Sequence, residues 1–481
     1  MLDVSGRAAH DVAIVGFGPV GAALANLLGV LGLRCVVLER EGAAYHLPRA
    51  VHFDDEVMRI FQGIGLAPGM EAITHASPGM RFVNAEGKLL IDWPRPPGHG
   101  PQFWHRSYRF HQPDLERVLR EGVGRFDCVA VRMRCEVLEI GQDAEGAWLA
   151  VRDLARGVDE VVRARFVVGC DGARSMVRRA IGTELEDLHA HQQWLVTDLV
   201  LTAPKPELGD FSIQNCDPAR PSTYVRGTGM RRRWEIMLMP GDDPAAAALP
   251  ETVWRFVARW LKPGEAEIER AAVYTFHAAI AREWRRGRML IAGDAAHMTP
   301  PFLGQGMCAG MRDVANLAWK LARVLGGADA RLLDSYAAER IDHVRDYIEI
   351  AVRLGRVIQE TDPAKARERD ARMAANPELM RSPAPRLGGH DGAPEPAGRI
   401  APQPVLSDGR LLDDAIGPGF GVLARPGFGA VPGAVVIEDA AVGGFLDEVG
   451  ARAVVLRPDR YVLGWGDSPD EVAEVLRRAL G

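Results

Sequence analysis

The stretch Val12-Ala-Ile-Val-Gly-Phe-Gly-Pro-Val-Gly21 decides the fold of this chain. Its apolar start, residues 12–15, predicts a buried strand, and the pattern G-x-G-x-x-G follows at Gly16, Gly18 and Gly21. Residues 22–33 carry an apolar face at helical spacing, and Glu39 closes the next apolar run. A strand, a glycine turn, a helix, a second strand and an acid in this order are typical of a dinucleotide-binding unit.

Each glycine of this turn has its own physical reason. A tight turn needs Gly16, close approach of the backbone to a pyrophosphate needs Gly18, and close packing of helix on strand needs Gly21. The start of the helix offers free N–H groups to phosphates, and Glu39 can accept hydrogen bonds from a ribose. We therefore predict a dinucleotide site, which can hold either NAD or FAD. The alternative is a glycine-rich turn in another α/β fold.

The composition argues against several classes of protein. The chain has 481 residues, 47% hydrophobic and 25% charged, as expected for a globular protein of two or three domains. A net charge of −6 argues against nucleic acid or an anionic membrane as the main partner. No apolar run is long enough to span a bilayer and the first residues lack a signal peptide, so we expect a cytoplasmic location. The six cysteines form no C-x-x-C, and the His and Cys residues lack ligand spacing, so we expect no metal site.

Two further apolar runs end in an acid beside a glycine, at Asp171-Gly172 and at Gly293-Asp294. An Asp at the carboxyl end of a parallel strand lies where open sheets bind ligands, although Asp-Gly alone is more often a turn. A helix is predicted to start near Gly304, and its positive end would stabilise negative charge on the pyrimidine edge of a reduced flavin. Alternatively, Gly306 and Gly310 let another helix pack closely.

Two polar residues outside these motifs each have two possible roles. Arg49 follows the first nucleotide unit, and it either meets a phosphate or the flavin edge or forms an ion pair with Asp54 or Glu56. Gln112 stands just ahead of a predicted helix, where its amide either faces a bound ligand or serves as an ordinary helix-entry group. The sequence leaves both choices open.

The rest of the chain predicts two further structural units. Alternating residues in 76–104 and 186–285 predict a second sheet, inserted into the first. Within it, the basic triplet Arg231-Arg-Arg233 has two possible roles. It either forms a solvated turn before a strand, or it attracts an anionic substrate or the phosphates of a nicotinamide nucleotide. Residues 361–403 have the composition of a linker, and residues 404–481 predict a small α/β domain without cysteine.

The three motifs, in this order, resemble those of the FAD-dependent aromatic hydroxylases, the flavoprotein monooxygenases typified by para-hydroxybenzoate hydroxylase. Finer stretches are similar to the 3-(3-hydroxyphenyl)propionate hydroxylase branch, such as residues 47–56 and Pro301-Phe-Leu-Gly-Gln-Gly-Met-Cys308. The resemblance implies an α/β fold with a Rossmann-like FAD-binding domain and an interleaved β-sheet substrate domain. It also implies a small thioredoxin-like C-terminal α/β domain without redox cysteines. The implied boundaries are 1–75, 105–185 and 286–360 for the FAD-binding domain, 76–104 and 186–285 for the substrate domain, 361–403 for the linker and 404–481 for the C-terminal domain.

Carried over by motif, the resemblance implies which residues hold FAD. The glycine turn would cradle the pyrophosphate, Glu39 the adenosine ribose and Asp294 the ribityl chain, while the backbone of Met307 and Cys308 would meet the flavin pyrimidine edge. The complete predicted set is Gly16, Gly18, Pro19, Val20, Gly21, Glu39, Arg40, Arg49, Gln112, Asp171, Gly293, Asp294, Pro301, Gly304, Gly306, Met307 and Cys308.

The base that would deprotonate a phenol is not identified by the resemblance. The candidates are His52, because histidine titrates near neutral pH, and Tyr224 and Arg226, because they lie on a predicted strand of the substrate sheet. A structural role is an equal alternative for each of the three. Pro301 completes the predicted catalytic set, since the resemblance places it beside the reactive face of the flavin.

The activity implied by the resemblance is hydroxylation of a phenol ortho or para to its hydroxyl, with NADH or NADPH as reductant of FAD and with O2. A 3-hydroxyphenylpropanoate-like acid is one expected substrate. The alternatives are hydroxylation of a polycyclic aromatic in a biosynthetic pathway, and a FAD-carrying protein that binds an aromatic ligand without turnover. We expect a homodimer and no nucleic-acid or membrane partner.

Overall fold

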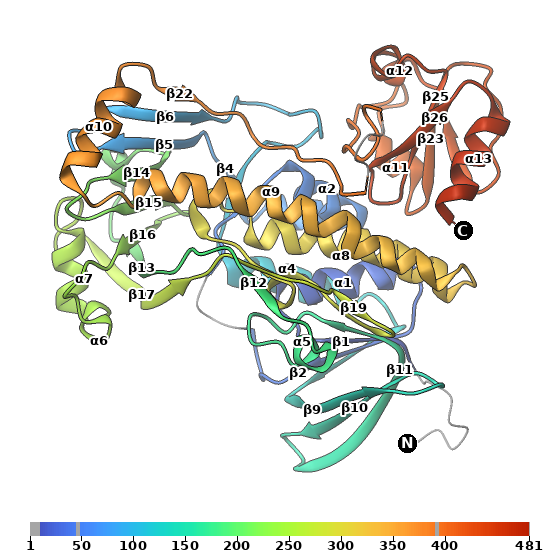
Figure 1. Ribbon diagram of the computed structural model, residues 1–481, viewed down its shortest axis with the longest axis horizontal. Coiled ribbons are helices and arrows are strands. Elements are labelled where there is room, and N and C mark those ends of the chain that lie inside the picture. The colour runs from blue at the N-terminus through green and yellow to red at the C-terminus, as the bar shows by residue number, and fades with distance from the viewer. Residues whose placement is uncertain (1–9, 45–48, 390–393, 481) are drawn as a thin grey trace.

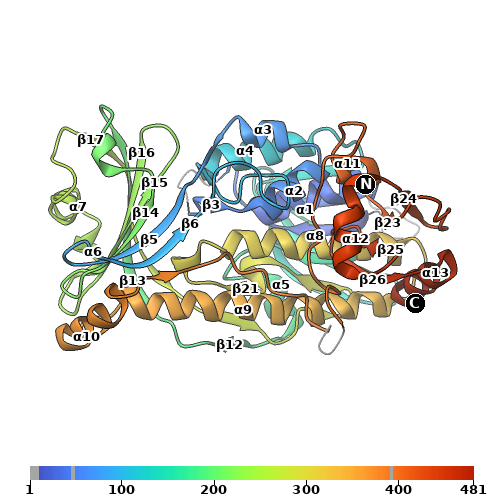
Figure 2. The same ribbon diagram turned by 90° about the horizontal axis from the view of Figure 1, so that it is seen from above.

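The computed structural model describes residues 10–44, 49–389 and 394–480, so the predictions for residues 1–9, 45–48 and 390–393 lie outside it. Figure 1 shows three parts: a sheet with helices at the centre, a second sheet at one end and a small C-terminal domain at the other. Helix α9 (Asp334–Ile358) runs along all three parts, as Figure 2 shows from above.

The central sheet is built around β1 (His10–Val15), in the order β19-β20-β11-β1-β2-β8. The pairs of β1 with β2, β1 with β11, β2 with β8 and β11 with β20 are parallel. The apolar runs 12–15 and 35–38 are buried in it, as expected for a parallel sheet with covered faces. The other strands are β2 (Cys35–Glu39), β8 (Val129–Met133), β11 (Val158–Gly169), β19 (Arg285–Arg286) and β20 (Met289–Ile291), with β9 (Cys135–Gln142) and β10 (Ala147–Asp153) as an antiparallel extension.

The register of this sheet brings the three predicted motifs to one edge. Val15 of β1 pairs with Gly169 of β11, and Gly169 pairs with Ile291 of β20. The glycine turn, Asp171-Gly172 and Gly293-Asp294 therefore follow directly at the same carboxyl edge. Helix α1 (Pro19–Val30) packs there against α4 (Gln112–Val123) and α8 (Gly306–Leu325).

The second sheet joins the two segments predicted to form it, in the order β17-β13-β16-β15-β14-β5-β6-β22. The segments meet where β5 pairs in parallel with β14. Arg231-Arg-Arg233 begins a strand, which excludes the first of the two alternatives for the triplet, a solvated turn. The strands are β5 (Gly79–Asn84), β6 (Leu89–Pro94), β13 (Gln192–Leu201), β14 (Ser212–Cys216), β15 (Ser222–Arg226), β16 (Arg231–Met237), β17 (Ala266–Phe276) and β22 (Glu378–Leu379), with helices α6 (Pro244–Ala247) and α7 (Pro250–Val257) beside them.

Short elements connect the two sheets. They include β3 (His52–Phe53), β4 (Thr74–Ala76) and β7 (Tyr108–Phe110), which pair with one another, and β12 (Leu185–Asp187), β18 (Ala279–Ala281) and β21 (His297–Met298), which do the same. Helices α2 (Asp55–Gly63), α3 (Ala67–Glu71) and α5 (Met176–Ile181) complete the central part. Helix α9 contributes buried side chains to the cores of both sheets, so the two are tied along its length.

Residues 361–403 contain more structure than a linker needs. Helix α10 (Pro363–Ala374) packs near β6, and β22 extends the second sheet at that strand. The C-terminal domain is α/β, as predicted, and its likeness to thioredoxin stays a prediction. Its sheet has the order β24-β23-β25-β26 and its elements are α11 (Leu412–Ile416), β23 (Phe420–Ala424), β24 (Ala434–Ile437), α12 (Gly443–Val449), β25 (Ala453–Leu456), β26 (Val462–Gly466) and α13 (Pro469–Leu480).

Candidate functional site

The glycine turn has the geometry that its sequence predicts. Gly16 has φ = +97°, and a Cβ there would lie 2.6 Å from the carbonyl oxygen of Cys170. A Cβ on Gly21 would lie 2.1 Å from the carbonyl oxygen of Gly16, so helix and strand could not approach as they do. A Cβ on Gly18 would meet nothing within 4 Å, which leaves the space in front of the helix open to a ligand.

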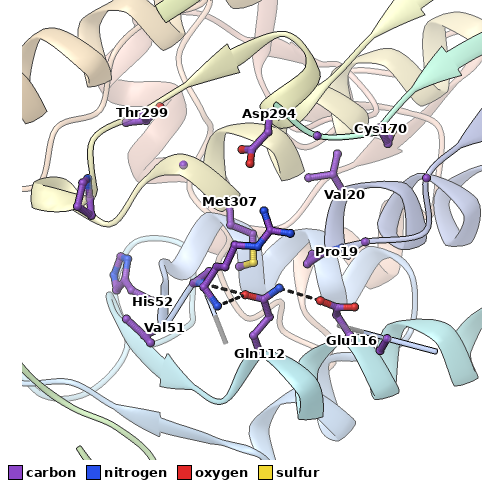
Figure 3. A pocket seen from close by; sticks show the side chains of 18 of the residues that line it. Pro19, Val20, Val51, His52, Gln112, Glu116, Cys170, Asp294, Thr299 and Met307 are labelled. Carbon is purple, nitrogen blue, oxygen red and sulfur yellow. Dashed lines mark hydrogen bonds between the residues drawn. The ribbon is translucent and has the colours of Figure 1, made fainter. Parts of the chain in front are cut away.

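A cavity of about 1110 Å³ opens in front of this turn and continues to the second sheet. Most of the predicted FAD-binding residues, Pro301 among them, line it. His52 lines it too, as Figure 3 shows. The predicted residues that line it are Gly16, Gly18, Pro19, Val20, Glu39, Arg40, Arg49, His52, Gln112, Asp171, Asp294, Pro301, Gly304, Gly306 and Met307. Those that do not are Gly21, Gly293, Cys308, Tyr224 and Arg226.

Tyr224 and Arg226 lie on the wrong face of β15 to act in this cavity. Side chains alternate along a strand, and it is Thr223 and Val225 that border the cavity. The hydroxyl of Tyr224 donates to the carbonyl oxygen of Gly209 at 3.2 Å, and Arg226 forms an ion pair with Asp210 at 2.5 Å. Neither side chain lines the cavity, which favours the structural role that the sequence left open as the alternative for both.

Gly293 and Cys308 lie behind the cavity wall. The backbone N–H of Gly293 donates to Asp313 of α8 at 3.0 Å, and His297 and Arg340 contact the same carboxylate at 2.7 and 2.9 Å. Asp313 is fully buried, and the contacts with His297 and Arg340 hold its pKa below the ordinary value in spite of burial. The Cys308 thiol is also buried, so the role predicted for this residue can involve its backbone alone.

Gln112 positions the chain around Arg49. Its side-chain oxygen accepts hydrogen bonds from the backbone N–H groups of Arg49 and Ala50 at 2.7 and 2.8 Å, and its amide nitrogen donates to Glu116 at 2.7 Å (Figure 3). Asp54 and Glu56, the acids considered as partners of Arg49, both bind Arg312 at 2.6 Å. Gln112 therefore fixes the backbone at the cavity wall through its amide oxygen.

Glu39 and Asp171 are also committed to backbone groups at the cavity edge. Glu39 accepts hydrogen bonds from the N–H groups of Phe17 and Glu41 at 2.7 and 2.8 Å, which holds the end of β2 against the glycine turn. Asp171 accepts from the N–H of Met176 at 2.6 Å and from the hydroxyl of Ser175 at 2.5 Å. Oδ2 of Asp171 also accepts from the N–H of Val177 at 3.3 Å. Its Oδ1 and both oxygens of Glu39 keep a second lone pair, so contact with a ligand is compatible with these bonds.

His52 is held as a neutral imidazole. Its Nδ1 lies 3.0 Å from the carbonyl oxygen of Gly304, and because a carbonyl only accepts, Nδ1 carries the proton and Nε2 the lone pair. Burial, and next the positive charge of Arg109, lower the pKa of His52 to about 3. The ring can therefore accept a hydrogen bond at Nε2, but it is a weak base.

The groups facing the cavity fit a dinucleotide with a flavin. Helices α1 and α8 begin there without a side-chain cap, so their first N–H groups are available to phosphate or to the flavin edge. The Asp294 carboxylate points into the cavity (Figure 3) and makes no hydrogen bond or ion pair within the described part of the chain. Such a carboxylate is suited to a ligand hydroxyl.

The sequence did not indicate the residues at the far end of the cavity. Arg95, Arg109 and Glu235 line it there, with Trp93 and Gln214. Arg109 stands between two aromatic residues on β7, all three buried, and a charge in such a buried run was the one available signal. Arg95 follows β6 in a proline-rich stretch, and only the tertiary fold brings it to the cavity.

Comparison with known proteins gives one consistent picture. A family model described as "FAD binding domain" matches residues 9–351. A protein named probable NADH-specific resorcinol 4-hydroxylase, from Rhodococcus jostii, is 39% identical over 99% of this chain and 96% of its own. The 3-(3-hydroxy-phenyl)propionate/3-hydroxycinnamic acid hydroxylase of Mycobacterium avium is 36% identical over 97% of this chain and 84% of its own.

Solved structures share the fold over almost the whole chain. The flavin-dependent monooxygenase PieE, in complex with FAD and substrate, has a TM-score of 0.81 at 22% identity, over 98% of this chain and 99% of its own. Aklavinone-11 hydroxylase, with FAD and aklavinone, has a TM-score of 0.80 at 23% identity with the same coverage. Across the part of the chain that the structure describes, no helix could cross a membrane and no cluster of side chains could hold a metal ion.

Proposed function

Because this chain belongs to the FAD-binding family of flavoprotein aromatic hydroxylases, we propose that it hydroxylates a monocyclic phenol that carries an acidic side chain. The reaction uses FAD, O2 and NADH, the reductant named for the relative from Rhodococcus jostii. The names of the two sequence relatives differ in one chemical respect: resorcinol is neutral, whereas 3-(3-hydroxyphenyl)propionate is an anion. The substrate end of the cavity favours the anion.

The environment of Arg95 is the observation that supports an anionic substrate. It lines the cavity, and its Nε and Nη1 are buried without a hydrogen-bond partner among the described residues. Its guanidinium lies 3.9 Å from the ring centroid of Trp93, and burial lowers its pKa to about 10. Guanidinium N–H groups buried without an acceptor are costly, so a ligand carboxylate that accepts from them would relieve the cost.

Arg109 adds a second cation beside Arg95. It is buried, donates to the hydroxyl of Ser212 at 2.7 Å and has a buried Nε without a partner among the described residues. Burial, and next the neighbouring charge of Arg95, lower the pKa of Arg109 to about 10. Two cations at one wall make a site for a carboxylate, which Arg binds with its planar set of donors.

The protein's own groups then orient the substrate and exclude water. Bound FAD supplies the redox chemistry of the reaction. The starts of α1 and α8 would hold its pyrophosphate and its pyrimidine edge, and Pro301 and Leu303 would wall the reaction space. The phenol hydroxyl would be oriented by a hydrogen bond to Nε2 of His52 or to the carboxylate of Glu235, whose pKa is raised by burial.

Two alternatives raised by the sequence gain no support. The structural neighbours, one of them in complex with aklavinone, are under 25% identical, so they bear on the fold alone. The sequence relatives are named as hydroxylases, which favours turnover over binding without reaction. A homodimer and a cytoplasmic location belong to the proposal as predictions from the sequence, and none of the residue roles above depends on them.

The test replaces Arg95 by Met and compares two substrates of similar shape, 3-(3-hydroxyphenyl)propionate and neutral 3-propylphenol. With R95M we expect kcat/KM for the acid to fall about 100-fold, because a buried charge-assisted contact is lost, and that for the neutral phenol to change little. Product formation and NADH oxidation are measured together. The free protein should be at least as stable as the wild type, since two buried guanidinium nitrogens without an acceptor are removed.

The matched control is Arg231→Met, which removes an arginine of the same sheet that pairs with Glu269 at 3.2 Å. It should leave the ratio of the kcat/KM values for the two substrates unchanged. The assignment is wrong if R95M lowers kcat/KM equally for both substrates. It is also wrong if the wild type turns over resorcinol but neither the acid nor 3-propylphenol.

A further inference from the structure

The C-terminal domain reaches the central part of the molecule through the turn between β25 and β26. Tyr461 of this turn is buried, and its hydroxyl donates to Oε1 of Glu56 at 2.7 Å. Glu56 belongs to the first turn of α2, 405 residues earlier in the chain. Arg457 of the same turn contacts Glu339 of α9 at 2.9 Å, so the turn lies between two helices of the central part.

From Glu56 the contacts continue to the start of α8. Oε2 of Glu56 accepts from Nε of Arg312 at 2.6 Å. Arg312 donates from Nη2 to Asp54 at 2.6 Å and from Nη1 to the side-chain oxygen of Gln305 at 3.0 Å. Gln305 in turn donates to Asp54 at 3.0 Å, which closes the network. Arg312 is buried, and the acids around it keep its pKa above the ordinary value.

The network ends at two segments of the FAD cavity wall. Gln305 directly precedes Gly306 and Met307, which line the cavity at the start of α8. Asp54 stands two residues after His52, which lines the cavity from the other side. Buried networks whose members are all satisfied hold their parts in one arrangement, and a displacement of a fraction of an ångström matters at such a wall.

We propose that Tyr461 is a positioning residue for the flavin site, so that the C-terminal domain holds the FAD-contacting start of α8 through Glu56, Arg312 and Gln305. This gives a role to a domain that has no cysteine and contributes no residue to the cavity lining among the described residues. The inference rests on FAD binding by this family and is independent of which phenol is the substrate.

The test uses the full chain with Tyr461→Phe, which removes the hydroxyl and keeps the ring. Stripped of FAD, the variant is titrated with FAD at equilibrium, and the absorption spectrum of the bound flavin is recorded. We expect the FAD dissociation constant to rise about 10-fold, since one hydrogen bond to a charged group is lost, and the flavin absorption band to shift because the start of α8 moves.

The control is Ser407→Ala, which removes a 3.0 Å side-chain hydrogen bond to Asp439 in the same domain, away from Tyr461. It should bind FAD as the wild type does. A double-mutant cycle of Tyr461→Phe with Gln305→Ala separates positioning from general stability, because residues of one network are non-additive. The inference fails if the two changes are additive in FAD affinity, or if Tyr461→Phe leaves both affinity and spectrum unchanged.

Discussion

At the scale of the residue, Asp294 is the side chain placed most directly for contact with FAD. Its carboxylate faces the cavity, whereas Asp313 behind it is occupied by Gly293 and His297. We expect Asp294→Ala to raise the FAD dissociation constant about 10- to 100-fold, because a charge-assisted hydrogen bond to a ligand hydroxyl is lost. Equilibrium titration of the FAD-free protein measures this, and Asp294→Asn, which keeps an acceptor, should lose less. Unchanged affinity in the Ala variant would remove Asp294 from the site.

Residues whose role follows from local backbone geometry could be predicted from the sequence. Gly16 and Gly21 are required by contacts of about 2 to 3 Å that follow from a strand, a tight turn and a helix. The strand that contains Tyr224 was predicted, but the side of the strand on which Tyr224 lies relative to the cavity was not. That side depends on how the strand pairs with its neighbours. Arg95 was missed because tertiary packing alone brings it to the cavity.

At the scale of the element, the start of α2 concentrates negative charge. Asp54 caps the helix by accepting from the N–H of Val57 at 3.2 Å, and Asp55 and Glu56 follow. Acids are favourable at this end of a helix, but three together repel one another. Burial, and next the charges of Asp54 and Glu56, raise the pKa of Asp55 to about 7, while Arg312 opposes the shift.

The raised pKa of Asp55 predicts a loss of stability as the pH rises. Between about pH 4 and pH 7 the folded state retains a proton that the unfolded state releases, so the free energy of unfolding falls across this window. Asp55→Asn should remove this contribution. The difference in free energy of unfolding, variant minus wild type, should therefore be about 1 to 3 kcal/mol larger at pH 8 than at pH 5. Denaturant unfolding at the two pH values measures it, with Glu251→Gln, at an exposed site in the first turn of α7, as control. The prediction fails if Asp55→Asn and the wild type differ in free energy of unfolding by the same amount at both pH values.

At the scale of the whole molecule, the sequence indicated the parts but not how they are joined. The two sheets and the C-terminal α/β domain all follow from periodicity and turn residues. The joints are buried polar contacts between residues hundreds of positions apart, such as Tyr461 with Glu56 and Arg59 with Asp413. No local pattern predicts such pairs, because the sequence around each partner alone predicts an ordinary surface residue in its own helix or turn.

The pair of Arg59 and Asp413 predicts that the C-terminal domain unfolds together with the rest of the chain. Arg59 of α2 contacts both carboxylate oxygens of Asp413 at 2.7 Å, and Arg460 lies 3.2 Å from the same group. Asp413→Asn would leave two buried cations without a counter-charge, at a cost of about 3 to 5 kcal/mol. In calorimetry of the FAD-bound protein we therefore expect the single transition of the wild type to divide, with the C-terminal domain unfolding first. Asp447→Asn, which removes the exposed pair with Arg425 in the same domain, should change the free energy of unfolding by less than about 1 kcal/mol. If Asp413→Asn keeps one transition at the wild-type temperature, the joint between the domains lies elsewhere, and the Tyr461 contact becomes the first place to look.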